Sequence, residues 1–242
     1  MEEIGKALKV VFDKISDFFD IFDLSFFVSG FFTTSIILAW IKLRELPLSI
    51  NFYETRSIII IVLFCYINGL LSFALGRWIR MGILAYPANF IRQRKQKPKG
   101  FDERFEKILK AHGMDSDPEI QKYLSRSEHR GIWRLYVLLW AKLRDNEKYA
   151  KSLAFLRRYW VMAATYDGLS ISIFIATLLV IEAKIGIIGN AMIIDLRLFI
   201  TIVSLLIFLF MACIREANRF VEYQIEEVVA SIVSNKESQG II

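Results

Sequence analysis

Four long apolar segments constrain the fold of this chain more than any other feature. They cover residues 24–41, 57–76, 161–181 and 198–214. Each is close to the roughly 20 residues that an α-helix rising about 1.5 Å per residue needs to cross a hydrocarbon layer of about 30 Å. Because 55% of the 242 residues are hydrophobic, the chain has more apolar surface than one soluble core of this length would bury. The sequence therefore predicts an all-α integral membrane protein with four transmembrane helices arranged as two hairpins.

The distribution of basic residues predicts the orientation of the chain. Residues 77–166 contain 20 Lys and Arg against 9 Asp and Glu, whereas the segments 42–57 and 182–197 contain only 3 and 2 basic residues. Basic loops remain on the cytoplasmic side, so residues 77–166 are expected in the cytoplasm and the two weakly basic segments outside. We therefore expect a multi-pass protein of the cell inner (plasma) membrane with both termini in the cytoplasm. The apolar stretch 132–143 is too short to cross and predicts a core or interfacial helix.

The segments outside the four spans also have helical patterns. Residues 1–23 place apolar and charged side chains on opposite faces, which is typical of a helix that lies at the membrane surface or packs on a soluble domain. Pro87 is expected to break the helix that leaves the second span. The predicted organisation is an amphipathic N-terminal helix (1–23), a first transmembrane hairpin (24–78), a basic helical cytoplasmic domain inserted between the hairpins (79–160), a second transmembrane hairpin (161–214) and an acidic cytoplasmic C-terminal helix (215–242).

Turn and capping signals divide the central domain into helices. Apolar residues recur at helical spacing from Phe101 to a stop at Gly113, and Pro118 follows a capping residue, as at the first turn of a helix. A third helix is predicted from about Glu128, and a fourth is expected to continue from Asn146 into the third span. The acidic segments at the two ends of the chain are expected to associate with this basic domain, within or between subunits.

Asp167 stands at the entrance of the third apolar segment and allows two interpretations. If the helix begins at Gly168, the carboxylate is an N-cap at the level of the lipid headgroups, which the capping preferences of aspartate favour. If the helix begins earlier, the carboxylate lies within the membrane, where it must face protein or water and marks a functional site.

Small and weakly polar residues recur on one face of each predicted span. In the second span Asn68, Gly69 and Ser72 share a face, and in the third Asp167 and Ser170 do. Such residues either let helices approach closely, which we expect in most of the spans, or line an aqueous path. On the second interpretation the pore candidates are Asn68, Ser72, Asp167 and Ser170. One four-helix bundle is too thin to enclose water, so a pore would require a homo-oligomeric ring, with a tetramer as the working assumption.

Two groups of basic residues are candidates for binding an anion. The first group lies in the basic linker and is typical of contact with anionic lipid headgroups; it comprises Arg92, Arg94, Lys95, Lys97 and Lys99. The second group alternates with aromatic residues, as in sites for phosphate and base; it comprises Lys148, Lys151, Arg157 and Arg158. The expected ligands are an anionic lipid, a nucleotide or an oligonucleotide.

The sequence predicts neither an enzyme nor a metal or cofactor site. The two histidines, His112 and His129, belong to no paired metal-ligand spacing, and the nucleophile and phosphate-binding motifs of common enzymes are missing from the sequence. Both cysteines, Cys65 and Cys213, fall inside predicted spans, which argues against a disulfide framework or a cysteine zinc site.

The order of these segments resembles that of the small four-transmembrane effectors encoded beside nucleotidyltransferases in bacterial antiviral-defence operons. The resemblance covers the whole chain as architecture and depends on the four spans, the basic segment 92–99 and the domain that ends at Arg157 and Arg158. It implies an oligomeric channel or pore controlled by a nucleotide-derived signal. Two alternatives remain: a membrane adaptor that recruits a soluble protein partner, and a small-solute carrier.

Overall fold

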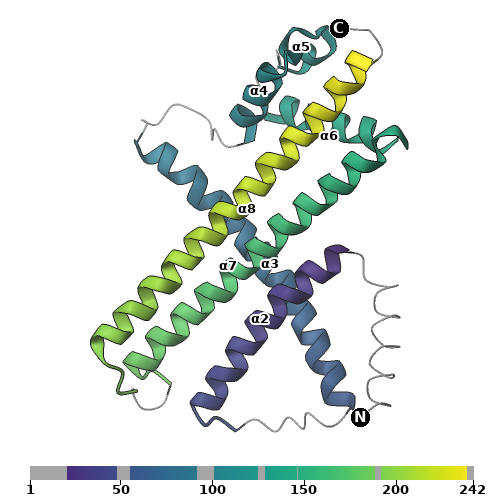
Figure 1. The fold of residues 1–242 in the computed structure, drawn as a ribbon. Helices are drawn as coiled ribbons and strands as arrows, with labels where there is room; N and C mark the ends of the chain where they lie inside the picture. Colours follow the sequence, from purple (N-terminus) through teal and green to yellow (C-terminus); the bar gives the residue numbers. More distant parts are fainter. Residues whose placement is uncertain are drawn as a thin grey trace. The chain divides into compact units, whose positions relative to one another are not determined.

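The computed structural model describes residues 21–47, 55–91, 101–124, 129–145, 147–188 and 192–238, and this part of the chain contains helices and no strand. Figure 1 shows the α-helices in chain order: α2 (Ile21–Leu43), α3 (Thr55–Ile91), α4 (Phe101–Ala111), α5 (Pro118–Leu124), α6 (His129–Arg144), α7 (Ala150–Ile185) and α8 (Leu196–Ser238). Two short 3-10 helices, η1 (Met114–Ser116) and η2 (Glu147–Tyr149), precede α5 and α7. Most of the amphipathic segment 1–23 and the basic candidates between Arg92 and Lys99 lie outside the described residues.

Four of these helices are long and apolar enough to cross a membrane. The candidate spans are Ser25–Leu43, Ser57–Met81, Glu147–Ile185 and Leu196–Ser234. This finding confirms the prediction of an all-helical chain with four candidate spans and indicates a multi-pass membrane protein. The stretch 132–143 was expected not to cross, and α6, which contains it, is not among the candidate spans.

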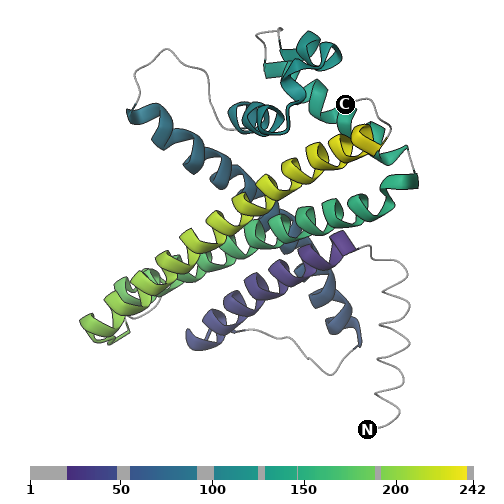
Figure 2. The ribbon, with the colours of Figure 1, turned by 45° about the horizontal axis from the view of Figure 1, so that its top comes forward.

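The chain divides into two compact units. The described residues within Met1–Trp78 and Ala164–Ala217 form the first unit, and those within Ile79–Ala163 and Asn218–Ile242 form the second. We call them the membrane unit and the helical domain. Helices α3, α7 and α8 each contribute residues to both, and Figures 1 and 2 show α7 and α8 side by side. The C-terminal segment therefore groups with residues of the central domain.

In the membrane unit, α2 crosses α3 with their backbones in contact. A Cβ atom added at Gly69 of α3 would lie 1.8 Å from the carbonyl oxygen of Phe26, and one added at Gly30 of α2 would lie 1.7 Å from the carbonyl oxygen of Cys65. No side chain fits at such distances, so glycine is required at both points. Close approach through small residues is the usual way in which membrane helices gain packing contacts, because lipid supplies no hydrophobic drive between them.

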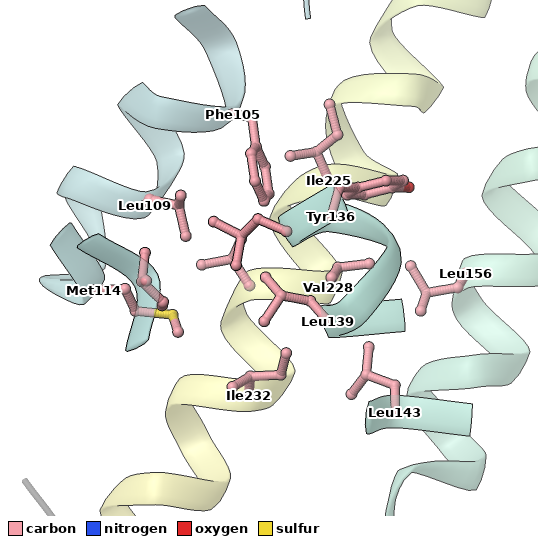
Figure 3. Packing of buried hydrophobic residues seen from close by; sticks show 13 residues of the cluster. Phe105, Leu109, Met114, Tyr136, Leu139, Leu143, Leu156, Ile225, Val228 and Ile232 are labelled. Carbon is pink, nitrogen blue, oxygen red and sulfur yellow. The ribbon is translucent and has the colours of Figure 1, made fainter. Parts of the chain in front are cut away.

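The helical domain has an apolar core built from segments that are distant in the sequence. Figure 3 shows Phe105 of α4, Leu139 of α6, Leu156 of α7 and Val228 of α8 pointing into it, and all four side chains are buried. The ring of Phe105 meets that of Tyr136 edge to face, with centroids 5.7 Å apart. The domain therefore includes the first turns of α7 and the last turns of α8.

Several predicted helix ends are found in the structure. Helix α4 ends just before Gly113, whose φ of 67° is in the left-handed region, and α5 begins at Pro118. The expected break at Pro87 is wrong, because α3 continues to Ile91. Proline at this position removes only one intrahelical hydrogen bond, the one to the carbonyl of Ile83, and the remaining bonds of the helix carry it further.

Candidate functional site: a polar core between the membrane helices

Asp167 lies in the interior of α7, so the N-cap interpretation is wrong. The helix begins at Ala150, because residues such as Leu156 belong to the core of the helical domain and extend the helical pattern before Asp167. The Asp167 side chain is 1% exposed. Gly76 of α3 lies directly opposite, since a Cβ atom added there would be 1.9 Å from the carbonyl oxygen of Asp167. The structure therefore places this carboxylate against protein within a helix that is able to span the membrane.

Hydroxyl groups from α2, α3 and α7 form a connected network in the membrane unit. Oγ1 of Thr33 lies 3.1 Å from Oγ of Ser72 and 2.8 Å from Oγ of Ser172. Ser172 also donates a hydrogen bond to the carbonyl oxygen of Ser29, at 3.2 Å. All four side chains are buried. Because each hydroxyl has a partner, burial away from water costs little, and the network fixes the three helices relative to one another.

The structure places every pore candidate against other helices of the same chain or its own helix. Ser72 joins the hydroxyl network, and Asn68 donates a hydrogen bond from Nδ2 to Oγ1 of Thr34 on α2, at 3.0 Å. Ser170 is fully buried and donates to the carbonyl oxygen of Asp167 on its own helix, at 2.7 Å. We refer to these residues together as the polar core: Ser29, Thr33, Thr34, Asn68, Ser72, Asp167, Ser170 and Ser172.

A partly buried ion pair that the sequence pattern did not predict joins the C-terminal ends of α2 and α7. Arg44 Nη2 lies 2.8 Å from Glu182 Oε1, and Arg44 Nε donates to Oε2 at 3.3 Å. Trp40 Nε1 donates to the same Oε2 at 2.8 Å, and the backbone N–H of Ile188 donates to Oε1 at 2.9 Å. The Arg44 and Glu182 side chains are only 5% and 11% exposed. We call this group the Glu182 clamp.

Sequence spacing gives no reason to pair Arg44 with Glu182, which were assigned to two separate external segments. The available signal is chemical: each is a charged residue in the last turn of an apolar segment or just after it. Between Asp167 and Glu182, polar residues recur along α7 over about 22 Å at 1.5 Å per residue. This length is most of the roughly 30 Å of a hydrocarbon layer.

The basic candidates of the helical domain lie on its surface. Lys148, Lys151, Arg157 and Arg158 are all exposed, on η2 and on the first turns of α7. A separate contact connects α4 with α8. Arg104 Nη1 donates to Oδ1 of Asn218 at 2.8 Å and lies 2.8 Å from Oε1 of Glu222. The acidic C-terminal segment thus contacts the central domain within one chain, as one of the two expected modes of association requires.

No family model, curated protein sequence or solved structure matches the chain. Its function must therefore be argued from the arrangement of its own residues.

Proposed function

We propose that the chain is a subunit of a homo-oligomeric ion channel or pore in the inner (plasma) membrane. The observation that carries the proposal is the burial of Asp167, at 1% exposure, in the interior of a helix able to span the membrane. A carboxylate at such a position is costly, and in membrane proteins it commonly belongs to an ion pathway or a proton relay. The neighbouring hydroxyls extend the polar surface along the same helix.

In the closed state of the channel, the residues of the polar core would be bonded to one another and would not line a water-filled path. Ser72 and Ser172 each bond to Thr33, and all three side chains are buried between α2, α3 and α7. If α7 moves away from α2, water replaces these hydrogen bonds at little net cost, because exchanging one hydroxyl partner for another is nearly neutral. Neighbouring copies around a symmetry axis would complete the wall that one thin bundle lacks.

The helical domain, on the cytoplasmic side, would control this movement. Leu156 of α7 and Ile225 of α8 are fully buried in its core, and both helices continue without interruption into the apolar spans. A hydrogen-bonded helix transmits rotation along its length. The exposed cations Lys148, Lys151 and Arg158 favour an anionic signal, and the architectural resemblance favours a nucleotide or oligonucleotide signal in antiviral defence.

Currents through planar bilayers containing the purified protein test this proposal. We expect cation-preferring conductance in the wild type and a clear loss of cation preference in Asp167→Asn, which keeps the side-chain size and removes the charge. Asp145→Asn is the matched control, because Asp145 is 68% exposed and lies outside the apolar segments. A particle that is monomeric and silent in every condition would contradict the proposal, as would equal ion preference in the two variants.

A solute carrier is the second candidate, because the polar core lies inside a single chain and needs no symmetry axis. Substrate-dependent counterflow in vesicles that contain monomeric protein would favour it over the channel.

A further inference from the structure

Three aromatic rings form a cluster where α7 and α8 lie side by side in the helical domain. The ring centroid of Tyr159 on α7 lies 6.3 Å from that of Phe220 and 5.8 Å from that of Tyr223, both on α8. The rings of Phe220 and Tyr223 are 6.1 Å apart and meet edge to face. All three side chains are partly exposed. The cluster therefore presents aromatic surface outward as well as packing the two helices.

Arg219 lies next to this cluster in a fixed orientation. Its Nε–H donates to the hydroxyl oxygen of Tyr223 at 2.5 Å, and its Cζ atom lies 5.2 Å from the centroid of the same ring. The side chain is nevertheless exposed. A guanidinium carries five N–H donors in a planar fork that matches two oxygens of a phosphate. Stacking on Tyr223 orients that fork before a ligand arrives, which reduces the entropy lost on binding.

The cluster lies where α7 and α8 leave their apolar segments. Arg219 follows the end of the fourth apolar segment, Ile214, by five residues, or about 7.5 Å. Tyr159 precedes the start of the third, Val161, by two residues. The headgroup layer extends roughly 5–7 Å beyond the hydrocarbon on each side. Tyr159 and Arg219 therefore fall within this layer or at its edge, whereas Tyr223, nine residues after Ile214, falls on its aqueous side. Tyrosine is favoured at this depth because its ring prefers the apolar side and its hydroxyl the wet side.

The charges near the cluster favour an anion. Arg157 and Arg158 are exposed next to Tyr159, and Arg215 is exposed one turn before Arg219. The acidic side chains nearby on α8 are Glu216, which is partly buried, Glu222, which pairs with Arg104, and Glu226, which is exposed about one turn after Tyr223. Positive charge therefore dominates the exposed surface.

We propose that this cluster is a binding site for one anionic phospholipid. The phosphate is held by the guanidinium of Arg219, and the glycerol lies against the ring of Tyr159, which is nearer to the apolar segments. The cluster lies next to the ends of two apolar spans, and this position favours a lipid over a soluble phosphate. The inference does not depend on the channel hypothesis, since a carrier or an adaptor would present the same surface to the membrane.

Native mass spectrometry of the delipidated full-length protein tests the site. The first bound molecule of phosphatidylglycerol is titrated and compared with phosphatidylcholine. We expect the wild type to prefer phosphatidylglycerol about tenfold, because both lipids carry the phosphate but the arginines repel the choline cation of phosphatidylcholine. Arg219→Gln should lose most of this preference. Tyr223→Phe should lose a smaller part of the lipid preference, since the guanidinium of Arg219 still packs on the ring and loses only the hydroxyl that accepts its hydrogen bond. Arg144→Gln is the control, because Arg144 is exposed on α6 and lies beside Asp145.

Three results would overturn the proposal. The first is equal affinity of the wild type for the two lipids, and the second is an equal loss in Arg219→Gln and Arg144→Gln. The third is displacement of phosphatidylglycerol by millimolar inorganic phosphate, which would assign the site to a soluble anion. Retention of the wild-type preference in Tyr223→Phe together with its loss in Arg219→Gln would still support the arginine as the phosphate ligand.

Discussion

The Glu182 clamp gives the sharpest stability prediction, because it is a partly buried ion pair between two helices that are far apart in the sequence. Replacing Arg44 with Met removes the charged partner and two side-chain hydrogen bonds to the carboxylate. Trp40 and the backbone N–H of Ile188 remain as neutral donors to Glu182. The carboxylate is then left in a poorly hydrated place without its counter-ion.

The magnitude follows from the burial of the two side chains. Breaking a buried pair by removing one partner costs about 3–5 kcal/mol, whereas an exposed pair contributes about 0–1 kcal/mol. Arg44 and Glu182 are 5% and 11% exposed, whereas Arg144 and Asp145 are 73% and 68% exposed. We therefore expect Arg44→Met to lower the free energy of unfolding by about 2 kcal/mol, between these two limits, because the pair is only partly buried, and Arg144→Met to change it by less than about 0.5 kcal/mol.

Equilibrium unfolding in mixed micelles of mild detergent and dodecyl sulfate measures this difference, with tryptophan fluorescence as the signal. The double variant Arg44→Met with Glu182→Leu closes a double-mutant cycle. It should be more stable than Arg44→Met alone, because no charge is left unpaired. The reasoning would be refuted by a loss below about 1 kcal/mol in Arg44→Met, the value of a solvent-exposed pair, or by a double variant less stable than the single one.

Three further predictions concern packing and ionisation. Gly69→Leu should destabilise the membrane unit by about 3 kcal/mol, because any Cβ there meets the carbonyl of Phe26; unfolding in the same micelles measures it, and a neutral result would contradict the close crossing. Val228→Ala should cost about 2 kcal/mol through the lost burial and the cavity left in the domain core, and thermal unfolding followed by circular dichroism checks this; no change would argue against that core. Burial raises the pKa of Tyr136 to about 12, although a hydrogen bond with Trp140 lowers it in part. The unfolded chain loses this proton near pH 10 and the folded chain near pH 12, so the free energy of unfolding should fall by up to about 1.4 kcal/mol per pH unit in that window. Tyr136→Phe should show a shallower fall when unfolding is measured from pH 9 to 12; identical slopes would show that this tyrosine ionises normally.

Much of the fold followed from one-dimensional patterns. The spans, α6 as a helix that does not cross, and the start of α5 at Pro118 are local properties of length, hydropathy and backbone chemistry, so the sequence predicts them well. Helix continuity was harder to predict. Pro87 and Asp167 are each a typical helix-end signal, but the energy of one lost hydrogen bond or one cap is small compared with the packing of the turns on either side.

The candidate site was predicted in part. Asp167, Ser72 and Ser170 were selected from the polar faces of their spans, and the structure buries all three. Periodicity shows that residues share a face, but it cannot show which helix covers that face. The partners Thr33 and Ser172 therefore emerged only when α2 and α7 were seen together.

The sequence by itself determined that this chain is helical and has four segments able to cross a membrane. Both properties depend on local composition alone: the hydrogen bonds of a helix form within one segment, and apolar side chains favour transfer of that segment from water. Only the tertiary structure decided that Arg44 meets Glu182, that Gly69 meets Phe26, and that the end of α8 completes the core of the helical domain. These contacts join residues far apart in the chain. They depend on how the surfaces of two helices fit together, and sequence periodicity does not show which helix packs against which.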